Sequence, residues 1–150
     1  MNLEEKRIKK SILINAPKEK VWDVLFTDRY TRIWYASFGE GSHAVTDWQL
    51  GSKAIFTDCS NNGLIGEVVE NKKNEKLSVE YTGILQADRE DYESELAKQV
   101  RGGRETYHIS EGDGVTYLQI ESDMAPEYFD DMSKAWVAAL EKVKALSESE

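Results

Sequence analysis

The sequence predicts an α+β fold in which an antiparallel sheet packs one face against a long helix. Residues 126–146 carry apolar side chains at steps of three and four, which is typical of an amphipathic helix. Between Gly39 and Asp123 the apolar spacing changes to a period of two, which indicates strands. Strands that follow each other so closely favour an antiparallel meander, and a single helix covering one face gives the α+β layer arrangement.

The N-terminal elements precede this meander. Residues 5–15 are expected to form a strand, with Ile8, Ile12 and Ile14 on one face. Residues 18–26 predict a short helix that begins after Pro17. A second short helix is expected at about 28–35, with Asp28 as its N-cap and Ile33 and Trp34 pointing inward.

The strands of the meander differ in how clearly they are marked. The clearest is the run 77–82, where Leu77, Val79 and Tyr81 alternate with polar residues. The runs 103–110 and 115–122 predict a hairpin, because Asp113-Gly114 between them is a strong turn signal. Weaker strands are expected at about 41–48, 52–59 and 64–71. The closing helix, 126–146, presents the stripe Phe129, Met132, Trp136, Leu140 and Val143.

Composition narrows the class of protein. The 150 residues suit one domain, 1–150, and 40% hydrophobic content is enough for a core. A formal net charge of −9 repels phosphate backbones, so nucleic acid is not an expected partner. No apolar run is long enough to insert into a membrane, and residues 1–10 lack the apolar core of a signal peptide. The single cysteine indicates a reducing compartment, and we expect a cytoplasmic protein.

The order of these elements and several motifs resemble a known group. The motifs are INAPKEKVWDVL (14–25), Trp34, TDWQLGSKAIF (46–56), GLIGEVVE (63–70), and Trp136 with Leu140. This ordered set resembles the START/SRPBCC superfamily, which includes the birch-pollen allergen. Within it, the set is most similar to the family of homologues of the activator of heat-shock-protein-90 ATPase. The resemblance implies a helix-grip fold, with a curved sheet of about six to seven strands wrapped around the C-terminal helix and two short helices after the first strand.

A curved sheet cannot lie flat on a straight helix, so large side chains or a ligand must fill the gap. Aromatic residues, at 10% of the chain, suit either filling. Trp22 and Trp48 are expected to be structural. The candidate cavity-lining residues, several of them placed on the concave face by the resemblance, are Trp34, Phe56, Tyr81, Tyr107, Leu118, Ile120, Met132 and Trp136. For these residues the alternative is plain core packing.

Catalytic and metal chemistry find little support in the spacing of residues. His43, His108 and Cys59 lie far apart and match no metal-ligand pattern, so we expect neither a metal nor a cofactor. Asp58, Glu67 and Glu105 lie on expected strands. A carboxylate that faced a dry cavity would have a raised pKa and could act as an acid or base, whereas an outward one would be solvated.

The segment 86–99 is acidic and is expected to form a weakly amphipathic helix with Leu85, Tyr92 and Leu96 on one side. It is either a mobile lid at the cavity mouth or an excursion without a role.

Together these observations favour a non-enzymatic protein, monomeric or homodimeric, that binds a small hydrophobic or amphipathic molecule between sheet and helix. One alternative is a protein-interaction module that contacts a chaperone or another protein, as the resemblance implies. The second alternative is an enzyme of the cyclase or hydrolase type that uses the same cavity.

Overall fold

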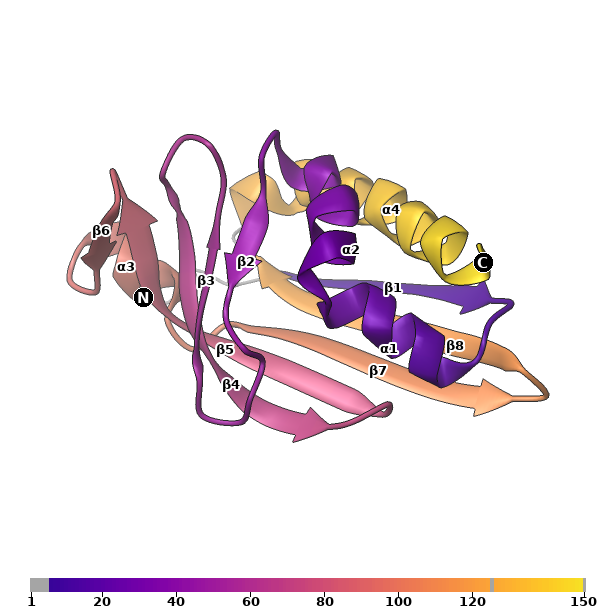
Figure 1. Cartoon of the computed structure of the whole chain (residues 1–150). Helices are drawn as coiled ribbons and strands as arrows, with labels where there is room; N and C mark the ends of the chain where they lie inside the picture. The colour runs from indigo at the N-terminus through magenta and orange to yellow at the C-terminus, as the bar shows by residue number, and fades with distance from the viewer. Residues whose placement is uncertain (1–5, 125, 150) are drawn as a thin grey trace.

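The fold is given by a computed structural model that describes residues 6–124 and 126–149 (Figure 1). The helical elements are α1 (Lys18–Phe26), α2 (Asp28–Trp34), the 3-10 helix η1 (Tyr35–Phe38), α3 (Glu95–Val100) and α4 (Pro126–Glu148). The strands are β1 (Lys6–Ile14), β2 (His43–Val45), β3 (Lys53–Thr57), β4 (Gly63–Lys72), β5 (Lys76–Gln86), β6 (Arg89–Asp91), β7 (Arg104–Gly112) and β8 (Val115–Met124). The predicted α+β class and the order of elements are confirmed.

The strands form one antiparallel sheet in the order β1-β8-β7-β5-β4-β3-β2, and the short strand β6 pairs with β5. The N-terminal strand therefore lies beside the last strand, while β3 and β2 form the far edge. The path confirms the helix-grip expectation of about six to seven strands. The hairpin between β7 and β8 also forms as predicted. Gly112 pairs with Val115, and Asp113 and Gly114 both adopt positive φ angles, 55° and 79°.

The long helix α4 runs above β1 and β8, and α1 and α2 lie beside it on the same face of the sheet (Figure 1). The core lies between these layers. Trp136, Leu140 and Val143 are buried along α4, and Phe129 and Met132 pack against the core from partly buried positions. The predicted stripe of the closing helix is therefore confirmed.

The register of β4 with β5 shifts at Ile65/Gly66 and at Val68/Glu70. Such bulges increase the local twist of a strand. At Gly66 a Cβ atom would lie 2.6 Å from Val79 Cγ1 and 2.9 Å from the carbonyl oxygen of Glu80. Only glycine allows the two backbones to approach this closely.

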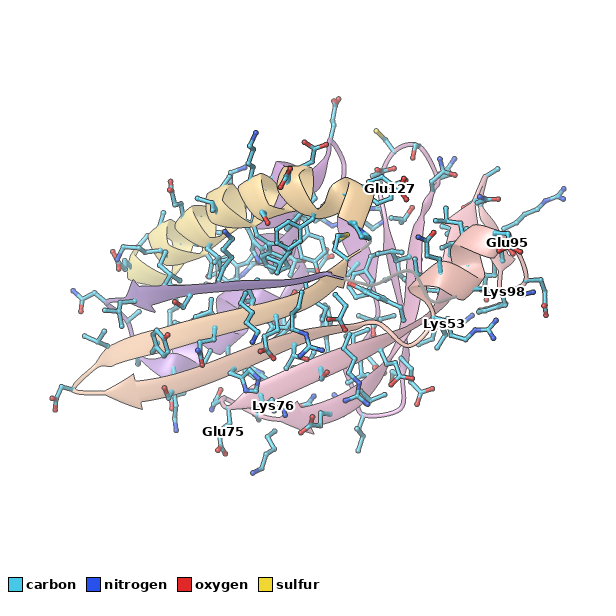
Figure 2. The ribbon with its side chains drawn as sticks, turned by 180° about the vertical axis from the view of Figure 1, so that it is seen from behind. Lys53, Glu75, Lys76, Glu95, Lys98 and Glu127 are labelled. Carbon is cyan, nitrogen blue, oxygen red and sulfur yellow. The ribbon has the colours of Figure 1, made fainter. Side chains whose placement is uncertain are left out.

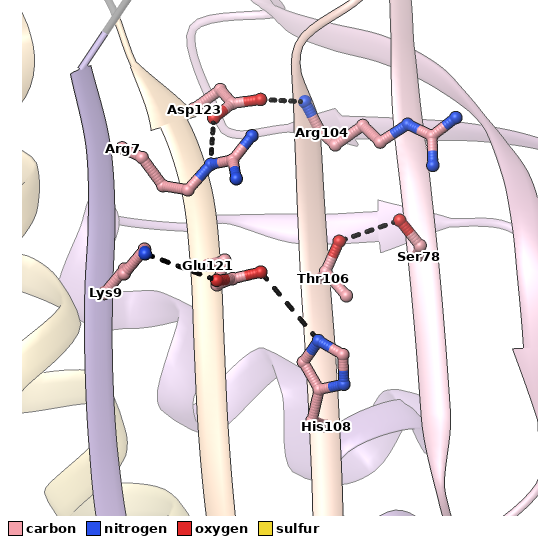
Figure 3. A network of polar contacts seen from close by, with 8 residues as sticks. All are labelled: Arg7, Lys9, Ser78, Arg104, Thr106, His108, Glu121 and Asp123. Atoms are coloured by element: carbon pink, nitrogen blue, oxygen red, sulfur yellow. Dashed lines mark hydrogen bonds and ion pairs between the residues drawn. The ribbon is translucent and has the colours of Figure 1, made fainter.

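The opposite, convex face of the sheet carries pairs of opposite charge (Figure 3). Arg7 Nε donates to Asp123 Oδ1 at 2.8 Å, and the second oxygen of Asp123 accepts from the backbone N–H of Arg104 at 3.0 Å. Glu121 lies within 4.0 Å of Lys9 Nζ and 3.8 Å of His108 Nε2.

Three local expectations were wrong. Ile33 is 48% exposed, although Trp34 beside it is buried as predicted. Asp28 is the first helical residue rather than the N-cap, and its carboxylate pairs with Arg32. Residues 86–99 are not one helix, because β6 folds back onto β5 and only Glu95–Val100 are helical. Ser94 begins that helix by accepting from the N–H of Ala97 at 3.2 Å.

Candidate functional site

A cavity with two adjoining chambers lies between the concave face of the sheet and the N-terminal half of α4. The inner chamber has a volume of about 200 Å³ and the outer chamber about 560 Å³. The chambers share the wall residues Asn62, Gly63, Leu64, Tyr81, Met124 and Met132. Because these six residues line both spaces, the two chambers lie side by side.

Aromatic side chains make up seven of the eighteen residues that line the inner chamber. They come from α2, η1, β3, β5, β7 and α4: Trp34, Tyr35, Phe38, Phe56, Tyr81, Tyr107 and Trp136. The ring of Trp136 lies at their centre, with its centroid 5.0 Å from Phe38, 6.0 Å from Trp34 and 6.1 Å from Tyr107. Such edge and tilted contacts are the favoured arrangements of aromatic pairs, so the rings hold each other in place.

One carboxylate, that of Glu105, lies inside this aromatic chamber. Glu105 pairs with Val79 on β5 and with Ser122 on β8, so it shares the concave face with these residues. Tyr81 donates its hydroxyl hydrogen bond to Oε1 at 2.9 Å, and Tyr107 donates to Oε2 at 2.5 Å. Each carboxylate oxygen therefore accepts one phenol and keeps further accepting capacity.

Burial raises the pKa of Glu105 above its ordinary value, because the charged form loses hydration. The hydrogen bonds from Tyr107 and Tyr81 oppose this rise, since they stabilise the carboxylate. Burial and the nearby Glu105 together raise the pKa of Tyr81 and Tyr107 well above the ordinary value. The same two causes act on Tyr35. The three phenols therefore keep their protons and remain hydrogen-bond donors at neutral pH.

Glu105 has no basic side chain beside it. Among the described residues, neither chamber is lined by a lysine or an arginine. His43 lines the inner chamber, but its electrostatic interaction is with Asp58. Its Nδ1 lies 2.9 Å from the carbonyl oxygen of Gly41. Hydrogen bonds from the Ser60 side chain and backbone, and then the charge of His43, lower the pKa of Asp58. Of the two carboxylates in the wall of the inner chamber, Asp58 lies near His43, and Glu105 accepts hydrogen bonds from phenols.

Ser122 adds an unused polar group to the same wall. Its side chain is 1% exposed, and its Oγ makes no hydrogen bond of good geometry with any described residue. The hydroxyl nevertheless lies near that of Tyr81. This contact lowers the pKa of Tyr81, against the larger rise that burial causes. A buried hydroxyl without a full partner costs free energy, which a polar ligand atom at this position would recover.

The outer chamber is apolar and leads toward α3. Its aliphatic and thioether wall consists of Leu64, Ile84, Leu85, Leu96, Val100, Met124 and Met132. The one acidic wall residue, Asp123, is already paired with Arg7 on the convex face. Glu95 and Lys98 of α3 point away from the body of the molecule (Figure 2), so this helix turns its apolar side to the chamber.

The structure brings six of the eight residues predicted from the sequence into the cavity wall. These are Trp34, Phe56, Tyr81, Tyr107, Met132 and Trp136. Leu118 and Ile120 are fully buried in the core and line neither chamber. A role in ligand binding stays a prediction for all eight.

Several wall residues were missed by the sequence analysis. Ser122 and Met124 continue the alternation of Leu118 and Ile120, so their phase was a usable signal. Tyr35 and Phe38 lie on the 3-10 helix after α2, which carried no signal of its own. Of the three carboxylates considered, Glu105 faces the cavity, Asp58 borders its rim, and Glu67 is exposed.

A larger hollow of about 860 Å³ lies between α1 and residues 47–50. Its floor contains Trp22, Phe26 and Trp48, whose rings also pack on the core. Its rim is charged, with Lys20, Asp23, Asp47 and Lys73 among the lining residues. This hollow is a surface groove and contains no buried ionisable group.

Neither a metal-binding cluster nor a membrane-spanning helix is found among the described residues. The described residues contain no group of three His, Cys, Asp or Glu side chains that could hold a metal ion. Within residues 6–124 and 126–149, none of the helices has the length and apolarity needed to cross a bilayer.

Solved structures share this fold. CalU16 from Micromonospora echinospora has a TM-score of 0.67 at 15% identity, with 97% of this chain and 76% of that chain covered. Protein MLL2253 from Mesorhizobium loti reaches a TM-score of 0.73 at 16% identity, with 94% and 96% covered. The Aha1 dimer from Colwellia psychrerythraea has the same TM-score and identity, with 95% and 97% covered.

No curated protein matches the sequence significantly. The family described as Activator of Hsp90 ATPase homolog 1-like protein matches residues 15–148, which is nearly the whole chain. The sequence motifs, the curved sheet around α4 and this match agree, and the chain belongs to that family, within the START/SRPBCC superfamily.

Proposed function

We propose that the protein binds a small hydrophobic or amphipathic molecule in the cavity between the sheet and α4, without transforming it. The single observation that carries this proposal is the two-chamber space itself, which the surrounding aromatic and aliphatic side chains leave open. Mostly apolar walls with a few polar groups are typical of sites for small molecules.

Leu64 offers a test, because it lines both chambers. The variant Leu64→Trp places a larger ring in the wall that both chambers share, so it should reduce the space in each. We expect the unmodified protein to bind N-phenyl-1-naphthylamine, a neutral fluorescent probe, and the variant to bind it at least ten-fold more weakly. The matched control is Leu13→Trp, because Leu13 is 60% exposed on the opposite face of β1. Equal binding by all three proteins would refute the proposal.

Native mass spectrometry of the protein purified from its host gives an independent test. A molecule that co-purifies with the unmodified chain and is lost in Leu64→Trp would identify the ligand class directly.

The acidic segment 86–99 is proposed to control access. Its helix α3 borders the outer chamber through Leu96, Gln99 and Val100. Hydrogen exchange at Glu95–Val100 is expected to slow when N-phenyl-1-naphthylamine binds, because a ligand orders a lid. Unchanged exchange would mean that the probe enters elsewhere.

An enzyme is the second candidate, and Glu105 is the observation that favours it. A carboxyl with a raised pKa, held between two phenols, can give or take a proton inside a partly dry space. If the protein catalyses a reaction, Glu105→Gln should retain a molecule of different mass from that held by the unmodified chain. The same molecule in both proteins favours binding alone.

The protein-interaction alternative rests on the family alone. Stimulation of the ATPase of a heat-shock-protein-90 chaperone by this chain would support it. The solved structure from Colwellia psychrerythraea is described as a dimer, and sedimentation velocity would distinguish a monomer from a homodimer for this chain.

A further inference from the structure

The inner and outer chambers differ in charge, and this difference bears on the kind of ligand they take. Glu105 lines only the inner chamber, whereas the outer chamber offers apolar side chains and one acid that is already paired. A ligand that matched both chambers would have a polar head for the inner space and an apolar tail for the outer one. The chemistry of the head is inferred from the fact that no described lysine or arginine lines the chamber beside Glu105.

Glu105 is an incompletely neutralised carboxylate. Its oxygens accept two phenols, at 2.9 and 2.5 Å, and a carboxylate offers about four accepting positions. Buried charges in proteins are normally paired with an opposite charge, because an unpaired one costs several kcal/mol. No described lysine or arginine lines the chamber, and the basic side chain that does line it, His43, lowers the pKa of Asp58. Within the described residues the carboxylate therefore has no cationic partner, a position that a cationic ligand group would fill.

The walls around Glu105 favour the same kind of partner. Aromatic rings attract cations through the negative potential over their faces, and cages of such rings bind ammonium groups. Here Tyr81 and Tyr107 contact the carboxylate, while the rings of Phe38 and Trp136 lie 5.0 Å apart in the same wall. The hydroxyl of Ser122, which makes no hydrogen bond of good geometry, provides one more acceptor for an N–H group. The net charge of −9 also draws cations toward the molecule.

We propose that the cavity binds an amphipathic amine, with its ammonium head against Glu105 in the aromatic inner chamber and its apolar tail in the outer chamber. This proposal rests on the proposed function, because it names the ligand class of the same cavity. A fatty acid or another anion is excluded by it, since a second negative charge beside Glu105 would be repelled. A neutral alcohol would occupy the same space without the charge contact.

Three probes of one tail length separate the proposal from its alternatives. Isothermal titration at pH 7.5 compares n-octylammonium, n-octanol and n-octanoate with the unmodified protein. We expect n-octylammonium to bind about ten- to a hundred-fold more tightly than n-octanol, because hydrogen bonds to charged groups are the stronger ones. n-Octanoate should bind more weakly than n-octanol. In 1 M NaCl the screening length is about 3 Å, so only a direct contact preserves the preference.

The variant Glu105→Gln keeps the size of the side chain and removes its charge. It should lose the preference for n-octylammonium over n-octanol, measured as the ratio of the two dissociation constants in the same variant. The matched control is Glu121→Gln, which removes the same charge from the convex face and should keep the preference. A preference caused by net charge alone would fall equally in both variants.

The outcomes separate the two proposals. If n-octanol does not bind, cavity binding itself fails. If n-octanol binds but n-octylammonium binds no more tightly, the amine proposal alone is overturned. It is also overturned if n-octanoate equals n-octylammonium, since Glu105 would then be protonated and donating, or if Glu105→Gln keeps the amine preference.

Discussion

The two faces of β7 differ in the partners of their charged side chains. Arg104 on the convex face lies 3.1 Å from Glu80, and Glu121 on the neighbouring strand lies between Lys9 and His108 (Figure 3). Glu105, one residue after Arg104, turns to the concave face and contacts only phenols. The charges named on the convex face therefore have partners of opposite sign, whereas Glu105 on the concave face has only hydroxyl donors. The ammonium head of the proposed ligand would supply the missing opposite charge.

Removal of a large ring should show the greatest difference between the faces. Tyr107→Ala on the concave face should lower the free energy of unfolding by about 3–5 kcal/mol, because it opens a cavity in a packed aromatic cluster. Tyr117→Ala removes the same side chain from a position that is 38% exposed and should cost less than about 1 kcal/mol. Urea denaturation measures both. Equal losses would contradict the distinction between the faces.

Removal of a single hydroxyl tests the contact with Glu105. Tyr81→Phe takes away the hydrogen bond of 2.9 Å and should destabilise the protein by about 1.5–3 kcal/mol at neutral pH, because the acceptor is charged. Tyr117→Phe is the control and should change stability by less than about 0.5 kcal/mol. A Tyr81→Phe protein as stable as the unmodified one would mean that Glu105 is neutral in the fold.

The pH dependence of stability should also separate the faces. The folded pKa of Glu105 is raised above the ordinary value of 4.5, so the native chain holds a proton that the unfolded chain releases. Its contribution to stability is therefore complete below the unfolded pKa and is lost as the pH rises through the folded pKa. Glu105→Gln should remove this loss, so its stability should fall less between pH 4.5 and 8 than that of the unmodified chain. An identical slope in the unmodified chain and in Glu105→Gln would refute the assignment.

The smallest effect is expected from an ion pair of the convex face. Glu80→Gln breaks the ion pair with Arg104. The side chain of Glu80 is 38% exposed and that of Arg104 is 48% exposed, so the free energy of unfolding should fall by only about 0–1 kcal/mol. The loss should shrink further in 1 M NaCl. A loss above 2 kcal/mol would show that the convex face is more than a solvated surface.

Much of this arrangement was predictable because alternation and helical spacing report directly on burial. Leu77, Val79 and Tyr81 alternate as expected, and the stripe through Trp136 faces the sheet. Phase along a strand does not show how far each residue lies from the helix. Leu118 and Ile120 share a face with Ser122, yet they lie in the closed part of the core, and only Ser122 reaches the cavity.

Other misses have local causes. Ile33 and Trp34 are neighbours within α2, so their side chains point about 100° apart around the helix, and only the side of Trp34 packs on the core. The inward position of Glu105 follows from the phase of Tyr107, two residues later. Sequence left its direction open because outward carboxylates are far more common than buried ones.

The close approach of backbones at Gly66 has a consequence for how this scaffold can change. A Cβ atom at Gly66 would collide with Val79 and with the Glu80 carbonyl, and a Cβ at Gly63 or Gly83 would collide with neighbouring backbone atoms in the same way. Wall side chains such as Glu105 and Leu64 take no part in these backbone contacts. We therefore expect that exchanges of wall side chains can alter ligand preference while the sheet keeps its shape, provided that these glycines are retained.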